Sequence, residues 1–150
     1  MRDPFAPINV VSVTDPAVSF DSPDARTEYI RTREPSLYKI AEGKRPAVFT
    51  VAPLASDLAI KLDHTAEYDR ALLAFRACVH SVSLPSGEVL SIVAEPGFVL
   101  GSLAPVEWVR TVARHVGVRR VEEIGEAAYR LSMMDDHDPL SQPPGQPPQS

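Results

Sequence analysis

The sequence predicts an α+β domain in which three main helices pack on a small antiparallel sheet. Two apolar periods of helical spacing stand next to each other between Leu103 and Met134. A third helical period covers residues 66–80. Two β-prone runs, 82–84 and 89–93, flank a turn sequence, which is typical of a β-hairpin. These features together define the expected fold class.

Residues 103–134 predict two helices joined by a short turn. Pro105 suits a first helical turn, and Gly117 suits the left-handed position that ends a helix. Gly125 lies inside the second helix, where it costs about 1 kcal/mol relative to alanine. We therefore expect a packing reason for it, such as the close approach of a neighbouring backbone. The two apolar stripes are Val106, Val109, Val112 or Ala113, and Val116, followed by Val121, Ile124, Ala128 and Leu131.

The helix expected at 66–80 has a start signal and one apolar face. Thr65 is a suitable N-cap, and acidic side chains follow it in the first turn, where they favour the helix dipole. The apolar face consists of Tyr68, Leu72, Phe75 and Val79. Upstream, the run Ala47–Ala52 is β-branched and aromatic and is bounded by prolines, which predicts a strand. Periodicity does not decide whether Leu54–Lys61 continues as strand or begins a short helix.

The first residues combine prolines with short β-branched pieces between Ile8 and Val13. Such a segment can pair as an edge strand or lie as an arm on a partner. Asp21 or Ser22 is a suitable N-cap, and Pro23 fits the first turn of a surface helix over 24–33 that Pro35 stops.

The prolines divide the chain. Of the 15 prolines, seven lie in the first 53 residues and five in the last 12. We expect a proline-rich N-terminal arm with a short helix over 1–44, a globular α+β core over 45–134, and a disordered tail over 135–150. The tail is acidic and then rich in proline and glutamine, so it has too few apolar side chains to offset the entropy of folding.

Composition excludes several classes of protein. The formal net charge of −5 argues against a nucleic-acid binder. A single cysteine, Cys78, leaves no internal disulfide and suits a reducing compartment. There is no signal-peptide pattern at the N-terminus and no window with the ~18 apolar residues of a membrane helix. We expect a soluble protein of the cytoplasm.

No constellation of residues predicts catalysis, and we expect neither an enzyme nor a cofactor. Cys78 lies on the apolar face of its helix, where a thiol packs as an inert small hydrophobe. The run Asp135–Asp138 is better explained as a solvated helix breaker than as a metal site. His64, His80 and His115 have no partner at ligand spacing and are expected to be structural.

Two features suggest a surface for a protein partner. Trp108 lies off the centre of its stripe, so it either widens the core face or anchors a partner. The arginines of this region either recognise a carboxylate-rich partner or form ion pairs on a solvated helix face. These arginines are Arg110, Arg114, Arg119 and Arg120, and the acidic residues near them are Glu107, Glu122 and Glu123.

The segment Ile124–Met134, with the sequence IGEAAYRLSMM, resembles the last helix of tail assembly chaperones of lambda-like long-tailed phages. In that family a helix ending in Tyr-Arg-Leu-Ser and methionine precedes a polar, proline-bearing tail. Ala104–Trp108 and the apolar run Leu72–Phe75 are compatible with the same layout.

The resemblance implies a non-enzymatic chaperone. Such a protein coats the tape-measure protein in the host cytoplasm, leaves before the virion is complete, and is also made as a longer frameshifted fusion. The interface expected on the helical pair consists of Trp108, Arg110, Arg114, Tyr129, Met133 and Met134. No nucleic acid or membrane is expected as a partner, and self-association stays open.

The alternative is a small virion component at the head–tail junction or on the capsid. An extended arm formed by residues 1–24 would then order on neighbouring subunits.

Overall fold

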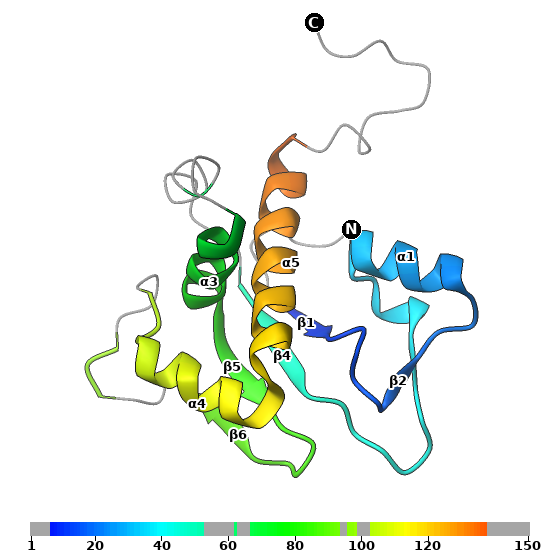
Figure 1. Cartoon of the computed structure of the whole chain (residues 1–150), viewed down its shortest axis with the longest axis horizontal. Helices are drawn as coiled ribbons and strands as arrows, with labels where there is room; N and C mark the ends of the chain where they lie inside the picture. Colours follow the sequence, from blue (N-terminus) through cyan, green and yellow to red (C-terminus); the bar gives the residue numbers. More distant parts are fainter. Residues whose placement is uncertain (1–6, 53–61, 63–66, 94–95, 99–102, 138–150) are drawn as a thin grey trace, which may run out of the picture.

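A four-stranded antiparallel sheet with the order β1-β4-β5-β6 carries helices α3, α4 and α5 on one face (Figure 1). This computed structural model describes residues 7–52, 62, 67–93, 96–98 and 103–137, without the side chains of 67–68 and 133–137. The predicted α+β class is confirmed. The elements are β1 (Ile8–Val11), β2 (Val18–Ser19), α1 (Pro23–Thr32), a 3-10 turn (Pro35–Leu37), β3 (Lys39–Ile40), β4 (Val48–Val51), α3 (Glu67–Cys78), β5 (Val79–Ser83), β6 (Val89–Ser91), α4 (Val106–Val116) and α5 (Val118–His137).

The two faces of the sheet differ in polarity, as the alternation of side chains along each strand dictates. One row across the four strands consists of Val10, Phe49, Val82 and Leu90, and it faces the helices. The neighbouring row consists of Asn9, Thr50, Ser81 and Ser91 and lies on the opposite face. The main apolar core therefore lies between the sheet and the three helices, and a second, smaller cluster contains Leu62, Ala74 and Tyr129.

Residues 8–11 form edge strand β1, as one of the two alternatives left by the sequence predicts. β1 pairs with β4 from Ile8 opposite Val51 to Val11 opposite Val48. Residues that precede the expected core boundary at 45 thus belong to the same sheet. The short pair β2–β3 and helix α1 lie beside this edge (Figure 1).

Local signals define several helix ends as expected. The hydroxyl of Ser22 accepts a hydrogen bond from the Ala25 N–H at 3.0 Å, and Pro23 begins α1. Gly117 separates α4 from α5 with a φ of 95°, and its N–H donates to the Ala113 carbonyl at 2.8 Å. Pro105 directly precedes α4 and does not lie in its first turn.

Two predicted boundaries were wrong. The helix expected to reach His80 ends at Cys78, and β5 begins at Val79 without a loop, because the β-branched Val79 pairs with β4 and packs in the core. His80 is the extra residue of a register shift between β4 and β5. At the other end, α5 continues past Met134 to His137. The expected tail after residue 137, the segment 54–61 and the Thr65 cap lie outside the described residues.

Gly125 has the packing role that the sequence predicts. A Cβ atom at Gly125 would stand 1.9 Å from the carbonyl oxygen of Ala71 in α3, far inside van der Waals contact. Small buried side chains, Ala74 on α3 and Ala128 on α5, lie on the same pair of helices. The missing side chain therefore lets the two helix backbones touch.

Replacing Gly125 with alanine tests this contact. We expect Gly125→Ala to lower the free energy of unfolding by at least about 2 kcal/mol, because the new methyl group must push α3 and α5 apart. Helix propensity alone would raise the stability by about 1 kcal/mol. Urea unfolding measures the difference, and Arg119→Ala on the exposed side of α5 is the control. An alanine variant as stable as the wild type would contradict the contact.

Candidate protein-binding groove

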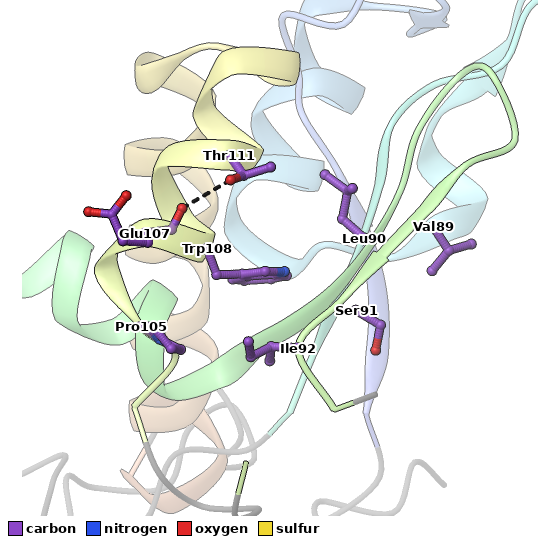
Figure 2. A pocket seen from close by; sticks show the side chains of 8 residues that line it. All are labelled: Val89, Leu90, Ser91, Ile92, Pro105, Glu107, Trp108 and Thr111. Carbon is purple, nitrogen blue, oxygen red and sulfur yellow. Dashed lines mark hydrogen bonds between the residues drawn. The ribbon is translucent and has the colours of Figure 1, made fainter. Parts of the chain in front are cut away.

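A groove of about 540 Å³ runs between helix α4 and strand β6. Figure 2 shows the ring of Trp108 between these two elements, with Leu90 on its side of the strand and Val89 and Ser91 on the other side. The residues that line the groove are Val89, Leu90, Ser91, Ile92, Pro105, Glu107, Trp108 and Thr111. Most of its lining is therefore apolar, with one carboxylate at the rim.

Trp108 belongs both to the core and to the groove. Its ring centroid lies 6.4 Å from that of Phe75, and its side chain packs against the main core cluster. The same side chain is only half-buried and lines the groove. The two alternatives predicted for Trp108 are thus compatible, because the core holds the ring in place while one side remains open to a partner.

β6 is the second edge of the sheet. The Ile92 N–H donates to the His80 carbonyl at 3.0 Å, and the Glu88 carbonyl accepts from the Leu84 N–H at 2.8 Å. Because backbone groups alternate in direction along a strand, those of Val89 and Ser91 point away from β5. Within the part of the chain that the structure describes, no other strand pairs with them.

Among the residues that the structure describes, this edge lacks two common devices against strand pairing. Val89 is 56% exposed and Val93 is 49% exposed. The segment from Val89 to Val93 has no charged residue and no proline, the two devices that commonly block an open edge. The edge is therefore a template for another strand, next to an apolar groove.

The opposite edge of the sheet is covered at its end. The Val11 N–H donates to the Tyr29 hydroxyl at 3.0 Å, and the Arg33 guanidinium donates to the Val11 carbonyl at 3.2 Å. Both side chains are buried and come from α1 or the residue that follows it. The end of β1 is therefore occupied, whereas β6 offers free backbone groups beside an apolar groove.

The six residues predicted as an interface do not form one surface. Trp108 lines the groove, and Arg110 lies next to it through an ion pair of 2.7 Å with Glu107. Arg114 is exposed further along α4. Tyr129 is buried, and the Arg70 guanidinium lies 4.4 Å from its ring centroid. Met133 and Met134 belong to α5, but their side chains lie outside the described residues.

Arg120, another arginine of the predicted cluster, has contacts within the chain. Arg120 donates to the hydroxyl and the carbonyl of Thr14 at 3.3 Å and 3.2 Å. These contacts favour the structural alternative for Arg120. The residues that sequence reasoning missed are Leu90 and Ile92, and the uncharged second strand of the predicted hairpin was the signal that could have identified them.

The cysteine and the described histidines, whose side chains could serve in catalysis or metal binding, make contacts that explain them structurally. Burial raises the pKa of the Cys78 thiol to about 12, despite a hydrogen bond with Ser132 that lowers it. The His80 ring lies 5.1 Å from that of Phe98, and the His115 Nδ1 lies 3.0 Å from the Thr111 carbonyl. His64 lies outside the described residues. The described side chains contain no group of three potential metal ligands.

Glu123 joins the N-terminal segment to α5. It forms an ion pair of 3.1 Å with Arg33, which is only 4% exposed. Its two oxygens also accept hydrogen bonds from the Ser12 hydroxyl at 2.6 Å and from the Val13 N–H at 3.0 Å. The sequence suggested only that Glu123 balances the charge of arginines near it in the chain. Its ion-pair partner, Arg33, lies 90 residues away in the sequence. This carboxylate is therefore explained by its structural contacts.

In comparisons with known proteins, no family model, no curated protein and no solved structure matches this chain. Among the described residues, no helix is both long and apolar enough to cross a membrane.

The Glu123 contacts are testable with a matched pair of variants. We expect Glu123→Gln to lower the free energy of unfolding by about 3 kcal/mol, because it leaves the buried Arg33 without a counter-charge. The neighbouring substitution Glu122→Gln is expected to change it by less than about 0.5 kcal/mol. Chemical unfolding followed by circular dichroism compares them. Equal stability of the two variants would show that the ion pair does not hold the N-terminal segment.

Proposed function

We propose that this protein is a non-enzymatic assembly protein of the phage tail chaperone type, which acts by contact with other proteins in the host cytoplasm. Its proposed partner is the tape-measure protein. The groove beside the free edge of β6 is the observation that supports action by contact with other proteins. An apolar groove with a fixed aromatic side chain and unpaired backbone groups has the chemistry that recognises an extended polypeptide.

The phage assignment is supported by the resemblance of the last helix. The segment Ile124–Met134 lies within α5, and its apolar residues Ile124, Ala128 and Leu131 pack in the core. The helical pair α4–α5 also occurs where the layout of the family implies it. The resemblance therefore concerns an element on which this fold depends.

The alternative, a virion component anchored by an extended N-terminal arm, has less support. Residues 8–11 of that arm pair with β4 of the same chain, and Ser12 and Val13 bind Glu123. This part of the arm would have to leave its own sheet to order on a neighbour.

Co-purification tests the proposal. We expect the chain to co-purify with a tagged tape-measure protein expressed from the same gene region. The variant Thr111→Arg should lower the recovered amount by about tenfold, because a long charged side chain then occupies the groove. Val118→Arg adds the same side chain at a valine that is 57% exposed and does not line the groove, so it should bind like the wild type.

An immunoblot of infected cells and finished particles separates the two candidates. A minor, longer product and absence from finished particles agree with the chaperone. A single band that remains with purified particles, together with no recovery on the tape-measure protein, would contradict it.

A further inference from the structure

The residue types along the free edge of β6 are arranged symmetrically around Ser91. On either side of Ser91 stand Leu90 and Ile92, and beyond them Val89 and Val93. We propose that the groove and edge bind a second copy of this chain, with the two β6 strands antiparallel around a two-fold axis at Ser91. This inference rests on the proposed role of the groove as a protein-binding site and names its occupant in the absence of the tape-measure protein.

The hydrogen-bonding groups fit this register. The backbone groups of Val89 and Ser91 point outward, because those of the even-numbered neighbours bond to β5. An axis at Ser91 places Ser91 opposite Ser91 of the second copy, and Val89 opposite Val93 of that copy. Outward groups therefore meet outward groups, and pairing extends the strand by the two residues that follow it.

The side chains fit as well. Leu90 faces the core side of the sheet, and in an antiparallel pair the residue opposite shares its face. Ile92 of the second copy then lies next to Leu90, on the side of the strand where Trp108 borders the groove (Figure 2). The exposed valines pair on the opposite face, and β-branched cross-strand pairs stabilise a sheet.

Charge and symmetry favour a second copy over an arbitrary peptide. No charged residue falls within the paired segment from Val89 to Val93, so no like charges face each other. The partner strand needs apolar residues that alternate around a small polar one, and this chain supplies that pattern in an exposed strand. Because Tyr29 and Arg33 cover the end of the other edge, the assembly closes as a dimer with one continuous sheet and does not grow into a filament.

Charge substitutions at Ser91 test the axis directly, because the axis places this residue opposite itself. We expect the purified wild type to be a dimer by sedimentation equilibrium. Ser91→Lys and Ser91→Glu should each weaken the dimer by about fivefold, since like charges then stand opposite each other. An equimolar mixture of the two variants should restore the dimer. Ser83→Lys, at an exposed residue of the inner strand β5, is the control and should dimerise like the wild type.

Circular dichroism confirms that each variant is folded. A wild type that is monomeric throughout the micromolar range overturns the dimer, and so does a dimer that neither Ser91 variant weakens. The failure of the proposed function is separate: a dimer with mixture rescue but no recovery on the tape-measure protein supports this inference and contradicts the chaperone. A wild type that is monomeric but is still captured by the tape-measure protein contradicts this inference and supports the chaperone.

Discussion

The backbones of α3 and α5 touch at Gly125, and this contact sets how closely the two helices pack. It brings the long helix α5 against α3 closely enough for both to cover the apolar face of one small sheet. The turn at Gly117 then directs α4 from the start of α5 over the same face. Because Trp108 of α4 packs next to Phe75 of α3, one wall of the groove rests on the helices that meet at Gly125.

Local patterns in the sequence predicted the elements well. The helices, the strand β4 and the hairpin were found from apolar periodicity and turn chemistry, which depend on neighbours in the chain. Gly125 was identified as a packing position because a glycine inside a helix is costly. The direct junction of α3 and β5 was missed, since Val79 continues the helical stripe as well as it begins a strand.

Contacts between distant residues were not predictable in this way. The pairing of Arg33 with Glu123 joins residues 90 positions apart, and no periodicity relates them. Trp108 was identified as a candidate for binding, but the groove was not, because it exists only where β6 becomes an edge beside α4. Strand order decides which strand is an edge, and that order is a property of the whole fold.

The two edges of the sheet differ in how far their backbone groups are covered, and the proposed function depends on this difference. At β1 the chain places Tyr29 and Arg33 against the last backbone groups, whereas β6 presents apolar residues without charge or proline. In the proposed dimer, the free backbone groups of one β6 edge pair with those of a second copy. Amide hydrogen exchange of Val89 and Ser91 across protein concentration tests this pairing most directly, with Leu90 as the reference because its backbone faces β5. We expect slow exchange of all three amides at high concentration and fast exchange of Val89 and Ser91 alone on dilution. Fast exchange of these two amides at every concentration would contradict it.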